Sequence, residues 1–136
     1  MRVYLACAMT NPQRDLTAVR QLFQVLLQEG HEVLTPHVVH GPEPRGEEDL
    51  SDAQLAQRDL ELLQQADCVV AEVSAPSHGV GVEIALALSR GKPALALAHR
   101  RAAVSRLLAG LPGLRLERYE SMSEIAEHVR AFVNST

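Results

Sequence analysis

One stretch, residues 66–87, decides the fold: it reads A-D-C-V-V-A-E-V-S-A-P-S-H-G-V-G-V-E-I-A-L-A. Residues 68–73 form a short apolar run rich in β-branched side chains, which is typical of a strand buried on both faces. Turn-forming residues interrupt this run at 74–79. From Val80 onward, apolar residues recur at helical spacing. The stretch therefore predicts a buried strand, a loop of small residues and a helix.

The loop at 74–79 has the properties of a ligand-binding turn. In an open α/β sheet such a turn lies at the carboxyl end of a strand, where ligands bind. We expect the backbone N–H groups of Gly79, Val80 and Gly81 to be free at the helix start, where an anion can dock. Glu83 places a carboxylate one turn further on, which indicates chemistry on a phosphorylated small molecule. The plain alternative, equally compatible with the local pattern, is that Ser77 only caps the helix and Glu83 faces water.

The composition of the chain limits the classes of function. With 136 residues, 46% hydrophobic and 22% charged, the sequence predicts a single soluble domain over residues 1–136. A net charge of −4 and only four aromatic residues argue against binding to a nucleic acid polymer. No apolar run approaches the ~20 residues of a membrane span, and the N-terminus lacks the layout of a signal peptide. We therefore expect a cytoplasmic protein without a membrane partner.

Cysteine and histidine usage gives no sign of a disulfide or a metal. Cys7 and Cys68 both lie in apolar, strand-like runs, as small buried thiols do in a reducing compartment. The six histidines show no metal-ligand spacing. We expect neither a metal nor another cofactor.

Strands and helices alternate along the whole chain. This alternation predicts an α/β fold, a flavodoxin-like or Rossmann-like three-layer sandwich with a five-stranded parallel sheet. The helix expected at 102–109 is too short to cover one face of the sheet fully. A second subunit is therefore expected to cover the rest of that face. Strands are expected at 3–8, 32–35, 68–73, 93–98 and 114–119, and a surface loop or lid at 36–49. Helices are expected from Asn11-Pro12 to Gly30, and at 51–66, 80–91, 102–109 and 121–132.

Two carboxylates are candidates for catalysis. Asp59 lies within the predicted helix 51–66, and Glu83 lies on the helix after the central strand, so both can face one cleft. Enzymes that cleave a glycosidic bond usually use a pair of carboxylates. One attacks or stabilises the anomeric carbon, and the other donates or accepts the proton. The alternative for Asp59 is a surface charge paired with Arg58 or Lys92.

The segment 59–84, D-L-E-L-L-Q-Q-A-D-C-V-V-A-E-V-S-A-P-S-H-G-V-G-V-E-I, resembles the 2'-deoxynucleoside 5'-monophosphate N-hydrolases. These enzymes belong to the nucleoside 2-deoxyribosyltransferase superfamily. The resemblance covers nearly the whole chain. It extends to V-Y-L-A-C at 3–7, L-T-P-H-V at 34–38, R-G-E-E at 45–48 and V-S-R-L-L-A-G at 104–110.

The resemblance implies catalytic roles for three residues. Glu83 matches the nucleophile that attacks the anomeric carbon of the sugar, and Asp59 matches the acid that assists it and the leaving base. Tyr4 matches a tyrosine that orients the nucleophile. The competing interpretation of Tyr4 is a core aromatic within the first strand.

The resemblance also implies substrate-binding residues. Ser77 and Gly79 match residues that bind the 5'-phosphate. Ser105 matches a serine that reaches the phosphate in the neighbouring subunit's site, although a hydroxyl on a helix surface is the competing interpretation. His37 matches a histidine near the base pocket.

The sequence departs from the family pattern in two places. The family's first loop has the form G-S-I-R-G-G, whereas residues 7–12 here read C-A-M-T-N-P. That loop helps to form the base and phosphate pocket, and we expect the hydroxyl of Thr10 to substitute there. His78 replaces an apolar residue at the phosphate turn and adds positive charge when it is protonated.

These observations predict a homodimeric hydrolase whose site is completed by the partner subunit. It would cleave the N-glycosidic bond of a (2'-deoxy)nucleoside 5'-monophosphate, giving a free base and (deoxy)ribose 5-phosphate, without a cofactor. Two alternatives stay open: a nucleoside 2-deoxyribosyltransferase, in which a second base replaces water, and a nucleotide-binding module without turnover. The base and the 2'-substituent are left open.

Overall fold

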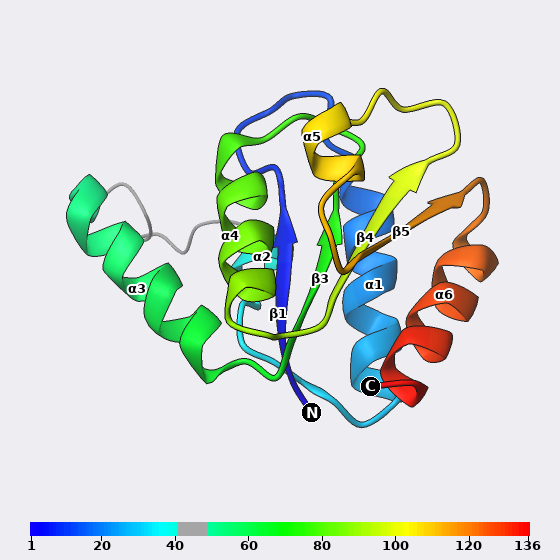
Figure 1. Ribbon diagram of the computed structural model, residues 1–136, viewed down its shortest axis with the longest axis horizontal. Helices are drawn as coiled ribbons and strands as arrows, with labels where there is room; N and C mark the ends of the chain where they lie inside the picture. Colours follow the sequence, from blue (N-terminus) through cyan, green and yellow to red (C-terminus); the bar gives the residue numbers. More distant parts are fainter. Residues whose placement is uncertain (41–48) are drawn as a thin grey trace.

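The sheet has five strands, all parallel, in the order β2-β1-β3-β4-β5 (Figure 1). A computed structural model describes residues 1–40 and 49–136 of the chain. This strand order is that of the flavodoxin-like doubly wound sheets, so the predicted fold class is confirmed. The strands are β1 (Arg2–Cys7), β2 (Glu32–Val33), β3 (Cys68–Glu72), β4 (Ala94–His99) and β5 (Leu114–Tyr119).

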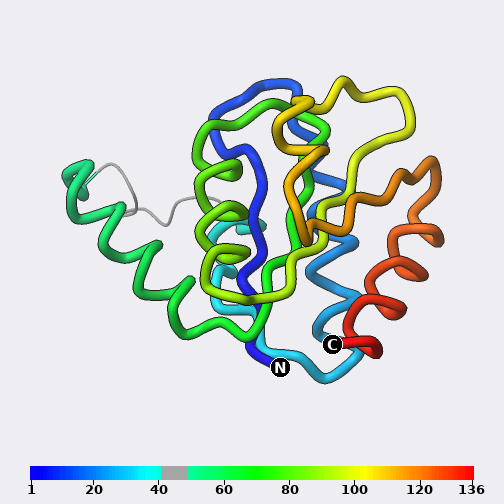
Figure 2. The backbone as a smooth tube through the Cα atoms, viewed as in Figure 1, coloured from blue at the N-terminus to red at the C-terminus, as the bar shows by residue number. Residues whose placement is uncertain are grey.

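Helices cover both faces of the sheet, as the backbone trace in Figure 2 also shows. Side chains of α1, α2 and α6 form one apolar cluster with the strands, and side chains of α3, α4 and α5 form the other. The helices are α1 (Leu16–Gln28), α2 (His37–His40), α3 (Asp52–Gln65), α4 (His78–Ser89), α5 (Arg106–Ala109) and α6 (Met122–Asn134). In the part of the chain that the structure describes, no helix has the length and apolar character needed to cross a membrane.

The two faces of the sheet differ in side-chain size. On the α1–α6 face the strands present large apolar side chains such as Leu5 and Leu97, which pack against the helix stripe. On the α4 face the methyl groups of alanines take their place, and α4 packs on these through Val80, Ile84 and Ala87. Small side chains let a helix approach a sheet closely. The alanines of this face are Ala6, Ala71, Ala94, Ala96 and Ala98, all buried.

The prediction that α1 starts at Asn11-Pro12 is wrong. Asp15 is the N-cap: its side chain accepts a hydrogen bond from the Ala18 N–H at 3.0 Å. Asn11 instead forms a turn, because its side-chain oxygen accepts from the Gln13 N–H at 2.9 Å. The chain therefore has an extra loop between β1 and α1, which borders the site described below.

Strand β2 is shorter than the predicted 32–35 because a side chain takes over its pairing. The buried Thr35 hydroxyl accepts from the Leu5 N–H at 3.0 Å and donates to the Leu5 carbonyl at 2.6 Å. These two bonds replace the ladder bonds of a longer strand. The chain is then free to turn at Pro36 into α2, a short helix within the region 36–49 that the sequence predicts as a loop. The R-G-E-E motif at 45–48 lies outside the described residues.

The helix predicted at 102–109 is only four residues long, Arg106–Ala109, and Ser105 is its N-cap. Consequently the sheet face over β4 and β5 has little cover within the subunit (Figure 1). Leu114 and Leu116 are only half-buried there, and Leu107 is 79% exposed. Thin cover on this face is confirmed.

Lys92, the sole lysine of the sequence, fixes the end of α3. Its ammonium donates to the backbone carbonyls of Leu63, Gln64 and Ala66 at 2.8, 2.6 and 2.6 Å. The last carbonyls of a helix have no partner within it, and a cation there also offsets the helix dipole. Lys92 therefore holds the helix that carries Asp59 to the turn between α4 and β4.

We expect Lys92→Met to lower the free energy of unfolding by about 2 kcal/mol, because three backbone carbonyls, two of them on buried residues, lose a charged donor. Urea denaturation followed by circular dichroism measures this loss. The control is Arg90→Met, since Arg90 is an exposed residue at the end of α4. Equal stability of the Lys92→Met variant and the wild type would contradict the capping role.

Candidate active site

The candidate site lies where the connections from β1 and β3 leave the sheet in opposite directions. The loop after β1 runs to α1 on one face, and the loop after β3 runs to α4 on the other. Such a switch point is where doubly wound folds bind ligands. The two loops are tied together by the Asn11 amide, which donates to the Pro76 carbonyl at 3.2 Å. They enclose a hollow of about 530 Å³, lined by residues 8–12 and 76–79.

Tyr4, Glu83 and Asp59 come together beside this hollow. Tyr4 lies on β1 and is 3% exposed, and its hydroxyl lies near enough to the Glu83 carboxylate for each group to shift the pKa of the other. Burial, the Glu83 carboxylate and the Asp59 charge all raise the pKa of Tyr4, so its phenol keeps its proton and acts as a donor. Tyr4 is thus both a core aromatic and a partner of Glu83.

Glu83 is a half-buried carboxylate with a pKa raised to about 7. Burial is the main cause, the neighbouring Tyr4 hydroxyl lowers the value, and the Asp59 charge raises it. Glu83 Oε1 lies 3.6 Å from the position of a Cβ atom at Gly79, so it lies directly behind the lining of the hollow. The alternative that Glu83 merely faces water is therefore wrong. A carboxylate whose pKa lies near neutral pH, next to a hollow in the surface, is typical of a functional site.

Asp59 forms an ion pair with its neighbour Arg58. The Arg58 Nε and Nη2 atoms both donate to Asp59 Oδ1, at 3.0 and 2.9 Å. Arg58 Nη2 also lies 3.4 Å from His37 Nε2, so α2 joins the cluster. The pairing with Arg58 that the surface alternative predicts is present, and a pairing with Lys92 is not, because Lys92 binds carbonyls. The charge of Asp59 nevertheless acts on both Tyr4 and Glu83.

The start of α4 offers backbone donors to the hollow, and of the three expected donors Gly79 is one, whereas Val80 and Gly81 are not. The Val80 N–H donates to Ser77 Oγ at 3.3 Å and the Gly81 N–H to the Ser77 carbonyl at 3.3 Å. Ser77 therefore does cap the helix. Among residues 1–40 and 49–136, the backbone N–H groups of His78 and Gly79 have no hydrogen-bond partner. These two amides, with the positive end of the helix dipole, are donors of the kind that bind an anion.

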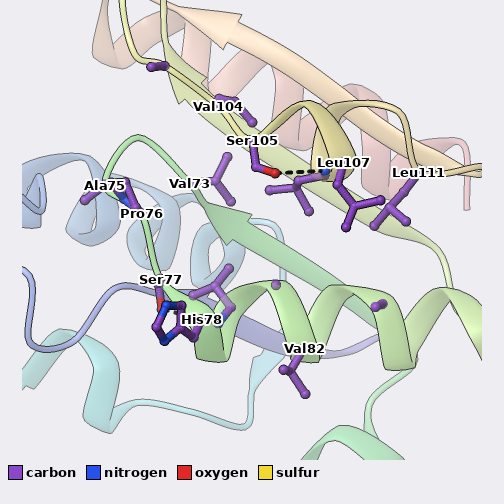
Figure 3. A pocket seen from close by; sticks show the side chains of 15 residues that line it. Val73, Ala75, Pro76, Ser77, His78, Val82, Val104, Ser105, Leu107 and Leu111 are labelled. Carbon is purple, nitrogen blue, oxygen red and sulfur yellow. Dashed lines mark hydrogen bonds between the residues drawn. The ribbon is translucent and has the colours of Figure 1, made fainter.

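Ser105 does not reach this hollow. Its hydroxyl accepts from the Leu108 N–H at 3.4 Å and caps α5. Figure 3 shows Ser105 and Ser77 on opposite walls of an apolar groove of about 490 Å³ between α4 and α5. Thr10, in contrast, is exposed and lines the hollow together with Ser77 and Gly79.

The sequence reasoning missed Glu72, which organises the loop leading to the site. Glu72 is 3% exposed and points to the α1 face. It accepts three hydrogen bonds: from Tyr119 Oη at 2.7 Å, the Ser74 N–H at 2.6 Å and Ser74 Oγ at 2.9 Å. Burial raises the pKa of Glu72, and these donors partly offset the shift. The available signal was an acid within an otherwise apolar strand.

Arg58 and His78 are also site features that carried no predicted catalytic role. Arg58 was considered only as a surface partner of Asp59, and His78 is exposed on the rim of both the hollow and the groove (Figure 3). Among the described residues, no three His, Cys, Asp or Glu side chains are grouped so as to hold a metal ion.

Comparison with known sequences gives consistent matches over most of the chain. A family model described as nucleoside 2-deoxyribosyltransferase matches residues 3–126. A protein of Thermofilum pendens named 2'-deoxynucleoside 5'-phosphate N-hydrolase 1 is 42% identical over 131 residues, 93% of this chain and 91% of its own. A mouse protein named 5-hydroxymethyl-dUMP N-hydrolase is 42% identical over 97 residues, 70% of this chain and 56% of its own.

Solved structures with the same fold include two from this enzyme group. A Clostridium botulinum CMP N-glycosidase superimposes with a TM-score of 0.70 at 21% identity, over 97% of this chain and 99% of its own. A 2-deoxyribosyltransferase from Bacillus psychrosaccharolyticus gives 0.67 at 21% identity, over 93% and 90%. These two structures support the fold alone. Together with the family model and the 42% identical relative, the switch-point site places this chain in the nucleoside 2-deoxyribosyltransferase family.

Proposed function

We propose that the protein hydrolyses the N-glycosidic bond of (2'-deoxy)nucleoside 5'-monophosphates, releasing the base and (deoxy)ribose 5-phosphate. The observation that carries this proposal is the Tyr4–Glu83 contact, with Asp59 acting on it, directly behind a loop that offers free backbone amides to an anion. The relatives named N-hydrolases support the reaction class.

In the first step, a Glu83 carboxylate oxygen attacks C1' of the sugar. The new bond is C1'–O(Glu83), and the bond that breaks is C1'–N, with its electron pair leaving on the base. Asp59 takes up a proton from solvent when the substrate binds and delivers it to the departing base. The neighbouring Tyr4 hydroxyl holds Glu83 in the attacking orientation. A pKa of about 7 leaves a sufficient fraction of Glu83 ionised at neutral pH.

In the second step, water attacks C1' of the glycosyl–enzyme ester. Asp59 takes a proton from this water, the C1'–O(Glu83) bond breaks, and Glu83 leaves as a carboxylate. Asp59 ends this step protonated and returns that proton to solvent, so protons balance over the two steps. The configuration at C1' is retained, as in glycosidases with a covalent intermediate.

The 5'-phosphate is assigned to the start of α4. The His78 and Gly79 amides and the Ser77 hydroxyl supply neutral donors, and hydrogen bonds to a charged group contribute about 1.5–3 kcal/mol each. Two or three of them favour a monophosphate over its nucleoside by roughly 10²–10⁴-fold, allowing for incomplete additivity. Thr10 and His37 are assigned to the remaining substrate contacts, with His37 towards the base.

The site is proposed to be completed by a second copy of the chain. Ser105 lies across the apolar groove from Ser77, on a four-residue helix that leaves Leu107 79% exposed. A homodimer that closes this groove brings Ser105 of the partner subunit towards the phosphate loop. The buried free thiols Cys7 and Cys68 support a cytoplasmic location.

A panel of nucleosides and their 5'-monophosphates tests the function. The protein is incubated with each compound, and free base and sugar phosphate are separated by chromatography. Release of base from monophosphates, with little from nucleosides, is expected. Sugar transfer to an added base identifies a transferase instead. Tight binding of a monophosphate without release of base identifies a nucleotide-binding module.

Glu83→Gln is expected to lower base release by a factor on the order of 10⁴, because an amide cannot act as the nucleophile. In the wild type, kcat/KM is expected to fall about tenfold per pH unit below the Glu83 pKa, which is about 7. Steady-state rates from pH 5 to 9 measure both effects. Near-normal turnover of the variant would exclude Glu83 as the nucleophile.

The same substitution is expected to stabilise the fold at alkaline pH. The pKa of Glu83 is about 7 in the folded protein against an ordinary value of 4.5. The stabilising contribution of its protonated form is therefore complete below pH 4.5 and is lost as the pH rises through about 7. At pH 8 the Glu83→Gln variant should be more stable than the wild type by roughly 1–3 kcal/mol.

Urea denaturation at pH 4.5 and pH 8 checks this difference, with the exposed Glu127→Gln as the control. If the stability difference between variant and wild type is the same at both pH values, burial of the ionised Glu83 carboxylate does not destabilise the fold.

Mixing two inactive variants tests the shared site. Ser105→Asp is expected to repel the phosphate in the partner's site, so its own homodimer should be inactive, as the Glu83→Gln homodimer is. In a mixed dimer, the Ser105→Asp subunit keeps Glu83 and receives an intact Ser105 from the other subunit. Equal mixing should restore about a quarter of wild-type activity, since half of the dimers are mixed and carry one good site. No recovery after subunit exchange would contradict completion in trans.

A further inference from the structure

The contact between Arg58 and Asp59 is asymmetric. Both guanidinium donors, Nε and Nη2, reach the same carboxylate oxygen, Oδ1, at 3.0 and 2.9 Å. In the part of the chain that the structure describes, Asp59 Oδ2 has no hydrogen-bond partner. One oxygen of this carboxylate is thus held by the guanidinium, and the other is left without a hydrogen bond in the described residues.

The pair is sheltered and joined to a third element. The side chains of Arg58 and Asp59 are 30% and 23% exposed, less than those of the other arginine–carboxylate pairs in the described residues. Arg58 Nη2 also lies 3.4 Å from His37 Nε2, so α2 and α3 meet at the guanidinium. A sheltered ion pair with two donors on one oxygen restrains the rotamer of the carboxylate more than a surface pair does.

The charge of Arg58 acts on the group formed by Tyr4, Glu83 and Asp59. The groups that act on Glu83 are Tyr4 from β1 and Asp59 from α3, and Arg58 in turn acts on Tyr4. Without a cation, the site would hold two carboxylates and a substrate phosphate with a charge of about −1.5 to −2 at pH 7. Negative charges that lie close together repel one another. The positive charge of Arg58 reduces this repulsion and so favours binding of the substrate.

We infer that Arg58 is a positioning residue of this site. It fixes Asp59 through Oδ1, leaves Oδ2 to exchange the proton with the base and the water, and offsets one negative charge of the carboxylate pair. This inference rests on the proposed function for the proton exchange, whereas its electrostatic part concerns the free protein.

The titration of Glu83 in the free protein tests the electrostatic part without substrate. The side-chain carboxyl carbon of Glu83 is followed by NMR from pH 4 to 9 in the wild type, Arg58→Gln, Asp59→Asn and the double variant. Arg58→Gln unmasks the Asp59 charge and should move the titration of Glu83 upward. Asp59→Asn removes that charge and should move it downward, each by about one pH unit or less.

The double variant should titrate like Asp59→Asn alone, since Tyr4 and Asp59, and not Arg58, are the groups that act directly on Glu83. The control is Arg130→Gln, which breaks an arginine–carboxylate contact of 2.8 Å between α6 and α1, outside the cluster. An unchanged Glu83 titration in Arg58→Gln, or an upward shift that persists without Asp59, would overturn the electrostatic role.

Arg58→Lys separates position from charge. Lysine keeps the positive charge but cannot place two donors on one oxygen. The Glu83 titration should therefore stay near that of the wild type, while kcat for the monophosphate falls roughly 10- to 100-fold with little change in KM. Unchanged kcat would overturn the positioning role. Wild-type protein that releases no base at all would refute the proposed function, but the NMR comparison would still decide the electrostatic role.

Discussion

The architecture of the site depends on one buried carboxylate at the end of β3. Glu72 accepts hydrogen bonds from Tyr119 on the edge strand β5 and from both the amide and the hydroxyl of Ser74. Ser74 Oγ in turn accepts from the His99 N–H at 2.7 Å, which ties the loop to β4. A buried ionisable group is stable only when its partners are in place, so the three strands β3, β4 and β5 are locked at their carboxyl ends. The loop to α4 leaves the sheet from this fixed point.

The candidate catalytic groups lie on the opposite face of the same sheet. Glu72 points towards α1, whereas Tyr4 and Glu83 meet on the α4 face. The sheet therefore separates the carboxylate of Glu72 from that of Glu83. Each of these candidate groups comes from a different element: Tyr4 from β1, Asp59 from α3 and Glu83 from α4. Their meeting point is therefore set by the packing of two helices on one strand, and the loop between β3 and α4 is fixed by Glu72 from the other side.

The order and type of the elements followed from the sequence because strand and helix periods alternate along it, and the strand–loop–helix at 66–87 was clear enough to place the site. Boundaries were less predictable where side chains replace backbone partners. Thr35 ends β2 by bonding to Leu5, and Asp15 rather than Asn11 caps α1. The placement of Tyr4, Glu83 and Asp59 together required the family resemblance. The pairing of Arg58 with one oxygen of Asp59, and of Glu72 with Tyr119, depends on tertiary contacts that no local pattern contains.

The alanine-lined face beneath α4 makes the site unequally sensitive to random substitution. A side chain that consists of a single methyl group leaves almost nothing to remove, so the commonest kind of damage to a core, the cavity left by truncation, hardly arises there. Enlargement is a different matter, because a valine or leucine at any of these positions overfills the space and pushes the helix outward. Glu83 lies on that helix and would move with it. Libraries that diversify this protein will therefore lose activity mainly through gains in side-chain volume, at strand positions that are remote from the substrate in sequence and carry no chemistry of their own.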